Sequence, residues 1–172
     1  MGLPASSEID MTTPAKPEDA ARAGEVAIAL PPASDAGVRF IGRIRTPFTT
    51  RKACPKNIAQ STAQGRVELD PVYAAGLKDL ERCSHIWLLY WMHEARRDLI
   101  VQVPGHLGTP RGTFALRSPV RPNPIAMAAV KLVAIEGTTL VVEPVDCLDG
   151  TPLVDIKPYY ASIDCRPNAT RP

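Results

Sequence analysis

The pattern of apolar and polar residues along the chain predicts many short strands. Residues 84–93 (SHIWLLYWMH) are apolar at consecutive positions between polar ends, which predicts a central strand that is buried on both faces. The other candidate strands combine apolar residues with Gly or Pro near their ends. They cover residues 38–44, 65–69, 99–103, 112–116, 125–135 and 139–145. So many short strands indicate a mainly β domain, folded as a closed or nearly closed barrel.

One helix is expected between the candidate strands at residues 65–69 and 84–93. Asp70 has the residue type of an N-cap, and Pro71 suits the first helical position. About ten residues follow with an apolar side at helical spacing. This side comprises Val72, Ala75, Leu77 and Leu80. Residues 49–63, in contrast, are polar and basic, and they predict a long loop of the kind that is often functional.

The first 38 residues differ in composition from the rest of the chain. They are rich in Ala, Pro, Ser, Thr and Glu and show no persistent periodicity, which predicts a flexible or loosely packed extension. Within them, residues 25–30 allow a short strand or turn that Pro31 and Pro32 end. The expected organisation is therefore an extension (1–38), a barrel domain (39–166) and a short tail (167–172).

The overall composition fits a folded protein of one domain. Of 172 residues, 45% are hydrophobic and 22% are charged. The longest apolar run, residues 86–92, is far shorter than the roughly 20 residues of a membrane-spanning helix. The N-terminus lacks the pattern of a signal peptide, and the four cysteines lie far apart. We therefore expect a cytoplasmic protein with reduced thiols, no membrane segment and no metal site.

The charge is distributed unevenly. Residues 1–38 carry six acids and two bases, whereas residues 39–172 carry eighteen bases and twelve acids. Residues 39–67 contain seven bases and no acid, which favours an anionic partner. A solvated basic surface explains the same run equally well, so charge alone leaves both interpretations open.

The segment from Arg117 to Ile125 (RSPVRPNPI) carries the densest chemical signal. Its three prolines fix an extended backbone and thereby fix the directions of Arg117, Arg121 and Asn123. Guanidinium groups grip carboxylate or phosphate, so this pattern predicts an anion-binding segment. A structural proline-rich corner with solubilising arginines is the alternative.

A second segment, Asp146 to Pro152 (DCLDGTP), follows an apolar strand. Asp149-Gly150 is a strong turn signal, so the aspartate can serve its own backbone. The alternative is that Asp146 and Asp149 accept hydrogen bonds from a ligand.

His93 lies at the end of the long apolar strand. Three interpretations of it stay open: a general base, a ligand contact, or a histidine whose hydrogen bonds are satisfied at the strand end. The chain contains no Walker loop, no Gly-x-Gly-x-x-Gly and no Gly-x-Ser-x-Gly motif.

These motifs occur in a recognisable order. IGxIxTPF (41–48), SHIWLLYWMH (84–93), GTFALRSPVRPNPIAM (112–127) and DCLDGTPLVDIKPY (146–159) follow one another. The combination resembles the TrmO family (TsaA-like or YaeB-like), the tRNA threonylcarbamoyladenosine N6-methyltransferases, over about residues 39–165. The resemblance implies a single-sheet antiparallel β-barrel with one or two short helices, unrelated to Rossmann methyltransferases. It also implies a homodimer that binds S-adenosylmethionine and methylates threonylcarbamoyladenosine beside the tRNA anticodon.

The resemblance assigns cofactor contacts residue by residue. A Pro-Arg-Gln segment of the family is replaced here by Pro-Lys-Asn, its His-Gln by His-Glu, and the glycine of its Pro-Ile-Gly by Ala126. The implied cofactor residues are Pro55, Lys56, Asn57, His93, Glu94, Arg117, Met127, Asp146, Cys147, Leu148 and Asp149. Longer family members carry a further C-terminal domain that helps to hold tRNA. Two alternatives therefore stay open: the same barrel methylating another substrate, and a non-enzymatic RNA- or ligand-binding barrel.

The expected chemistry is an in-line methyl transfer, for which positioning and desolvation supply most of the catalysis. The urea-like acceptor nitrogen must lose a proton, and Asp149, or the amide of Asn123 relaying through water, is the predicted acceptor. Arg121 and Lys157 are predicted to bind the threonyl carboxylate or RNA phosphates. Arg43, Arg51 and Lys52 are predicted to bind phosphates of the RNA.

Overall fold

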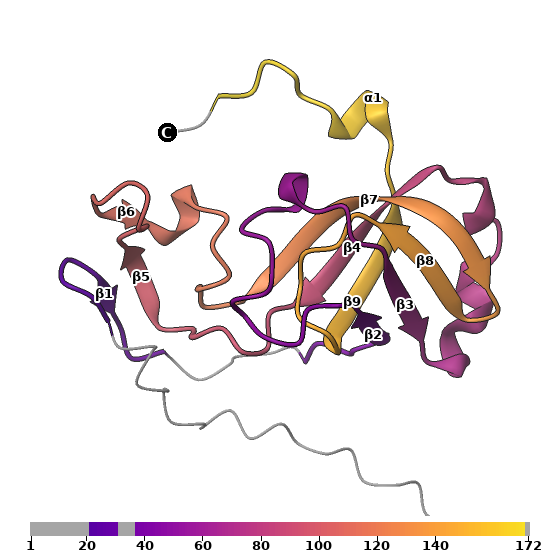
Figure 1. Ribbon diagram of the computed structural model, residues 1–172, viewed down its shortest axis with the longest axis horizontal. Helices are drawn as coiled ribbons and strands as arrows, with labels where there is room; N and C mark the ends of the chain where they lie inside the picture. Colours follow the sequence, from indigo (N-terminus) through magenta and orange to yellow (C-terminus); the bar gives the residue numbers. More distant parts are fainter. Residues whose placement is uncertain (1–20, 31–36, 171–172) are drawn as a thin grey trace, which may run out of the picture.

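A closed six-stranded barrel forms the main body of the protein (Figure 1). The computed structural model describes residues 21–30 and 37–170. The barrel strands are all antiparallel to their neighbours. In order around the barrel they are β2 (Gly42–Arg45), β3 (Gly65–Leu69), β8 (Thr139–Glu143), β7 (Ile125–Glu136), β4 (His85–Trp91) and β9 (Thr151–Pro158). The barrel predicted from the strand pattern is thus confirmed.

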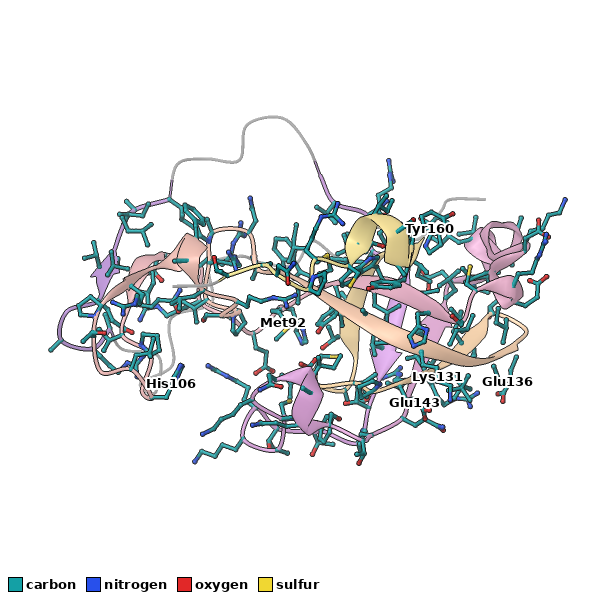
Figure 2. The ribbon with its side chains drawn as sticks, turned by 90° about the horizontal axis from the view of Figure 1, so that it is seen from above. Met92, His106, Lys131, Glu136, Glu143 and Tyr160 are labelled. Atoms are coloured by element: carbon teal, nitrogen blue, oxygen red, sulfur yellow. The ribbon has the colours of Figure 1, made fainter. Side chains whose placement is uncertain are left out.

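The interior of the barrel is filled by alternate residues of these strands. Ile44, Val67, Ile86, Leu140 and Leu153 are fully buried there. Because side chains of a strand alternate between two faces, their neighbours point outward. On the outer face, charged side chains pair across strands: Lys131 Nζ lies 3.2 Å from Glu143 Oε1, and Arg66 Nη2 lies 2.8 Å from Glu136 Oε2 (Figure 2).

Strand β4 lies between β7 and β9, as expected for a central strand. Its burial alternates, however, so the prediction of burial on both faces is wrong. A small closed barrel has one interior, and the outer face is covered only where another segment packs on it. The outward Trp87 is covered in this way by the short helix α1 (Ala161–Asp164) and by the ring of Tyr159, 5.5 Å away.

A small second sheet lies beside the barrel. It contains β1 (Val26–Ala27), β5 (Leu99–Gln102) and β6 (Arg111–Gly112), with β5 in the centre. Figure 1 shows it at the opposite end of the molecule from β8, and in Figure 2 His106 marks its outer end, whereas Met92 lies between the two sheets. Part of the segment that the sequence predicted to be loosely packed is therefore paired with β5. Residues 1–20 and 31–36 of this segment lie outside the described residues.

Several predicted elements are corrected by the structure. The strand expected at 112–116 is the 3₁₀ helix η5 (Thr113–Ala115), because the buried Thr113 hydroxyl donates to the carbonyl of Leu99 and turns the chain. The strand expected at 38–44 is β2, which begins only at Gly42, where a Cβ would lie 2.2 Å from the carbonyl oxygen of Glu68. Strand β9 was missed, since its prolines at both ends and its charged residues conceal the pattern.

The helix expected after Asp70 is also wrong. The structure has two 3₁₀ helices, η3 (Pro71–Leu77) and η4 (Leu80–Arg82), separated at Asp79 by a left-handed backbone (φ 64°). Asp70 makes no side-chain cap, and Val72 is 81% exposed. The loop over 49–63 is confirmed, with only the short 3₁₀ helix η2 (Ile58–Gln60) within it.

Candidate functional site

A cavity of about 770 Å³ opens at one end of the barrel. Five segments that are distant in the sequence line it: residues 51–58, the end of β4 with residues 92–95, residues 117–121, the start of β7, and residues 146–151. A volume of this order suits a ligand of cofactor size. Two of the segments are the motifs that the sequence singled out, and the barrel closure brings them together.

Most of the sequence-predicted site residues line this cavity. They are Arg51, Pro55, Lys56, Asn57, His93, Glu94, Arg117, Arg121, Met127, Asp146 and Leu148. The other predicted site residues are not among its lining. These are Arg43, Lys52, Asn123, Cys147, Asp149 and Lys157.

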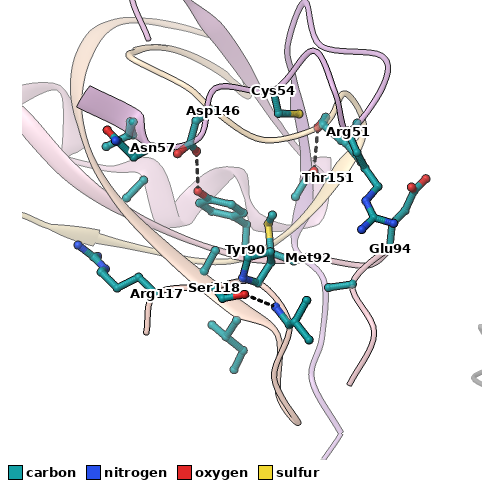
Figure 3. A pocket seen from close by; sticks show the side chains of 18 of the residues that line it. Arg51, Cys54, Asn57, Tyr90, Met92, Glu94, Arg117, Ser118, Asp146 and Thr151 are labelled. Atoms are coloured by element: carbon teal, nitrogen blue, oxygen red, sulfur yellow. Dashed lines mark hydrogen bonds between the residues drawn. The ribbon is translucent and has the colours of Figure 1, made fainter. Parts of the chain in front are cut away.

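Asp146 and Tyr90 form a hydrogen-bonded pair in the cavity wall. The hydroxyl of Tyr90 donates to Oδ1 of Asp146 over 3.0 Å (Figure 3). Burial raises the pKa of the Asp146 carboxyl, and the hydrogen bond from Tyr90 partly offsets this. Burial, followed by the nearby Asp146 charge, raises the pKa of the Tyr90 hydroxyl as well. Tyr90 therefore remains a hydrogen-bond donor over the whole physiological pH range.

The Arg117–Arg121 segment forms a rigid wall of the cavity. The guanidinium of Arg121 donates to the carbonyls of Leu116 and Ser118, at 3.2 and 3.3 Å, so it fastens its own loop. The hydroxyl of Ser118 accepts from the backbone N–H of Val120. Arg117 is exposed, and Nη2 lies 3.5 Å from the carbonyl oxygen of Met127. Arg117 is thus the more exposed of the two arginines that this segment contributes to the cavity lining.

The first long loop covers the cavity from the other side. Asn57 Oδ1 accepts from the backbone N–H of Ala59 and begins η2, so its side chain shapes the loop. Cys54 is half-buried, and Sγ contacts the carbonyl of Thr50 at 3.6 Å. Burial, with the Asp146 and Glu94 carboxylates, raises the pKa of the Cys54 thiol. Lys56 and Asn57 lie in the same cavity as Arg117 of the same chain.

The carboxylate of Asp149 accepts a hydrogen bond from the backbone of a neighbouring segment. Its Oδ1 accepts from the N–H of Thr46 over 3.1 Å, and its Oδ2 lies 3.6 Å from Arg45. Gly150 follows with φ +76°, a conformation that favours glycine. Asp149-Gly150 is therefore a turn, as one interpretation had it, although its carboxylate accepts from the backbone of Thr46 rather than from its own. Asp146 is the carboxylate of this pair that lines the cavity. Arg43 likewise donates to the carbonyl of Gly150.

The other residues outside the cavity have separate surroundings. Lys157, on the outer surface of β9, pairs with Asp155 at 2.7 Å. Cys147 is buried in the core, where desolvation raises the pKa of its thiol to about 12. Asn123 and Lys52 are exposed. Within the described ranges, no group of three His, Cys, Asp or Glu side chains is placed to hold a metal ion, and no helix is long and apolar enough to cross a membrane.

Sequence reasoning missed several cavity residues. Tyr90 stands inside an apolar run, and only strict alternation from the buried Ile86 and Leu88 identifies it as an inward-facing hydroxyl. Met92 and Ile125 add apolar surface, and neither carries a recognisable signal. Their places depend on how the barrel closes.

Residues 43–165 match the family described as the tRNA-methyltransferase O N-terminal domain. The chain belongs to the TrmO family. The protein is 44% identical over 137 residues to the probable S-adenosyl-L-methionine-binding protein VirR of Rhizobium radiobacter, covering 80% of this chain and 78% of that protein. It is 41% identical over 95 residues to the tRNA (adenine(37)-N6)-methyltransferase of Mus musculus, covering 54% of this chain and 22% of that one.

A comparison with solved structures agrees with this family. The crystal structure of TrmO from Pseudomonas aeruginosa superposes with a TM-score of 0.68 at 35% sequence identity, covering 81% of this chain. This chain covers 62% of that TrmO chain. Of the cofactor residues implied by the TrmO resemblance, all but Cys147 and Asp149 line the cavity.

Proposed function

We propose that this TrmO-family protein is an S-adenosylmethionine-dependent methyltransferase that methylates N6-threonylcarbamoyladenosine in tRNA, next to the anticodon. The supporting observation is the cavity, which gathers the family motifs from five distant segments. The names of the bacterial and mouse relatives agree with this activity. A tRNA substrate also agrees with a cytoplasmic location.

The lining of the cavity fits S-adenosylmethionine. Met92, Ile125 and Met127 offer apolar surface for the base and for the neighbourhood of the sulfonium. Asp146 offers a carboxylate to hydroxyl or amino groups, whereas Arg117 offers a cation to the carboxylate of the methionine moiety. Apolar walls with a few convergent polar groups are typical of cofactor sites.

When bound, S-adenosylmethionine supplies a methyl group activated by the positive sulfur. The cavity residues contribute orientation and exclusion of water, which are the main requirements of an in-line transfer. The acceptor nitrogen loses its proton in the reaction. Asp146 is the carboxylate best placed to receive this proton, because it lines the cavity and is held by Tyr90. Asp149 and Asn123, the acceptors predicted from the sequence, lie outside the cavity lining.

The anionic substrate requires cations around the cavity. Arg51 and Lys56 stand at its lining and are exposed, which suits the threonyl carboxylate and nearby phosphates. We further propose that the protein acts as a homodimer, which doubles the basic surface available to tRNA.

The test is a pair of measurements on the purified protein. Calorimetric titration with S-adenosylmethionine is expected to show binding, and transfer of labelled methyl groups is expected with tRNA that carries threonylcarbamoyladenosine. The same tRNA without this modification is the matched control and is expected to accept none. Cofactor binding without transfer to modified tRNA would favour another substrate. Absence of cofactor binding would favour the non-enzymatic alternative and contradict the proposal.

A further inference from the structure

Strand β1 (Val26–Ala27) lies outside residues 43–165, which match the TrmO family, yet it completes the sheet beside the cavity. Residues 22–28, here called the β1 strap, run along β5. Val26 and Ala27 pair with Val101 and Leu99, and the N–H of Ile28 donates to the carbonyl of Asp98.

Glu25 anchors the β1 strap. Its side chain is 3% exposed, and Oε1 accepts from the backbone N–H of Val103 at 3.1 Å and from Nη2 of Arg22 at 2.8 Å. Oε2 accepts from the backbone N–H of Arg22 at 3.0 Å. Burial raises the pKa of Glu25, but these hydrogen bonds outweigh it and hold the pKa at about 2. A buried carboxylate with this many donors fixes its surroundings strongly.

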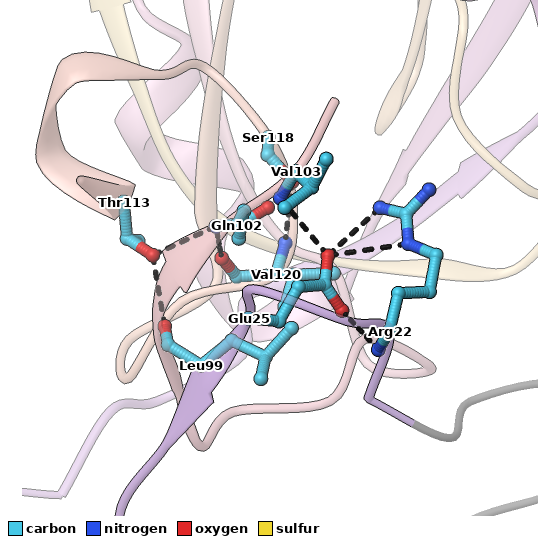
Figure 4. Close-up of polar contacts among 8 residues, drawn as sticks. All are labelled: Arg22, Glu25, Leu99, Gln102, Val103, Thr113, Ser118 and Val120. Carbon is cyan, nitrogen blue, oxygen red and sulfur yellow. Dashed lines mark hydrogen bonds and ion pairs between the residues drawn. The ribbon is translucent and has the colours of Figure 1, made fainter. Parts of the chain in front are cut away.

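Gln102, the residue before Val103, connects β5 to the cavity wall formed by residues 117–121. Gln102 is 6% exposed, and its Nε2 donates to the carbonyl of Val120 at 2.7 Å and to the hydroxyl of Thr113 at 2.8 Å. The Thr113 hydroxyl in turn donates to the carbonyl of Leu99. Val120 lines the cavity. Figure 4 shows the continuous series of contacts from Arg22 through Glu25 and β5 to Val120.

Strand β5 has a pairing partner on each side, β1 and β6. In the described residues β5 belongs to the small sheet, and β6 pairs with it at only two positions, Val101 and Gln102. An isolated two-stranded sheet is only marginally stable in water, and a third strand adds to its stability. Without β1, the groups that hold Val120 would therefore stand on a weakly ordered strand.

We infer that the β1 strap, anchored by Glu25, positions the cavity wall formed by residues 117–121 and thereby sets the affinity for the cavity ligand. Glu25 is a positioning residue in this arrangement. The inference rests on the proposed function only for the identity of the ligand, S-adenosylmethionine.

The test compares Glu25→Ala and Glu25→Gln with the wild type. Hydrogen exchange of peptides covering residues 113–122 is expected to accelerate in Glu25→Ala, while β4 and β7 keep wild-type protection. The dissociation constant for S-adenosylmethionine is expected to rise about three- to thirtyfold, and KM to rise with kcat unchanged. Glu25→Gln retains an oxygen for the Val103 N–H but loses the charge, so its exchange rate and its dissociation constant are expected to lie between those of the wild type and Glu25→Ala. Glu81→Ala, at an exposed site on η4 outside the cavity lining, is the matched control.

Wild-type exchange over residues 113–122 in Glu25→Ala would overturn the inference. Faster exchange throughout β4 and β7 would overturn it too, because the effect would then be general destabilisation. If the wild type binds no S-adenosylmethionine, the proposed function fails. The exchange measurement then still decides whether the β1 strap orders the wall.

Discussion

The hydrogen bond from Tyr90 to Asp146 joins a buried hydroxyl of β4 to a half-buried carboxylate in the cavity wall. A carboxylate in such a place has a raised pKa, and each hydrogen bond it accepts keeps the ionised form accessible. At the scale of single residues, the chemistry of the cavity therefore depends on a donor that comes from inside the barrel.

Tyr90→Phe removes this donor. The pKa of Asp146 is expected to rise further, because the hydrogen bond that lowers it is removed. If ionised Asp146 is the active form, activity falls as pH drops through this pKa, so the acid limb of the kcat/KM profile is expected to move to higher pH. Tyr73→Phe, on η3 away from the cavity lining, is the control. An acid limb at the wild-type position in Tyr90→Phe would contradict the role of Asp146.

Arg117→Ala removes the exposed cation of the proline-rich wall. The affinity for S-adenosylmethionine is expected to fall by about 1.5–3 kcal/mol, the usual contribution of a hydrogen bond to a charged group. Calorimetry measures the effect. Arg66→Ala on the outer face of β3, where Arg66 pairs with Glu136, is the control and is expected to bind normally. Equal affinities of Arg117→Ala and wild type would remove Arg117 from the cofactor site.

At the scale of elements, short segments persist because particular side chains hold them. Helix α1 has four residues, too few to be stable alone. Oδ2 of Asp164 accepts from Nε1 of Trp87 at 3.0 Å and from the N–H of Tyr160 at 2.8 Å, which fixes the helix to the outer face of β4.

Asp164→Ala is expected to lower the free energy of unfolding by about 1–2 kcal/mol, because both donors lose their acceptor. Urea denaturation followed by tryptophan emission measures this change and also reports a wetter environment for Trp87. Asp70→Ala serves for comparison, since Asp70 makes no side-chain cap on η3. Equal stability of the two variants would show that Asp164 does not hold α1.

The elements that sequence predicted well are those with a clear local cause. Residues 65–69 alternate strictly and form β3 as expected. The wall of residues 117–121 was found because prolines restrict the backbone whatever the fold. The sequence prediction failed where tertiary contacts decide the structure. Val72 belongs to the helical spacing of apolar residues, yet it is exposed, whereas Leu77 of the same expected face is buried in the core. Tyr90 was missed because its function depends on Asp146, 56 residues away.

At the scale of the whole molecule, the basic loop contributes two cations to the cavity lining, Arg51 and Lys56. Arg51 lines the cavity, Lys52 is exposed next to it, and Arg43 donates to the carbonyl of Gly150. A large anion bound over the cavity would therefore meet part of the basic run that the sequence identified.

Joint replacement of Arg43, Arg51 and Lys52 by alanine is expected to weaken tRNA binding. It is also expected to flatten the salt dependence by about one unit of slope for each phosphate that the protein no longer neutralises. Filter binding over a series of salt concentrations measures the slope. The binding of S-adenosylmethionine in the same variant reports whether the cavity is intact. An unchanged slope would identify the basic run as a solvated surface.

The pairing of β2 with β9 has a consequence for how the protein is made. Gly42 pairs with Leu153, so the first barrel strand can complete its pairing only when the last one is present. Contacts between segments so distant in sequence slow folding, because a long chain must be ordered before they form. On the ribosome, β2 and β3 emerge well before β9. The closed barrel, and with it the cavity at one of its ends, is therefore completed only after β9 has been synthesised.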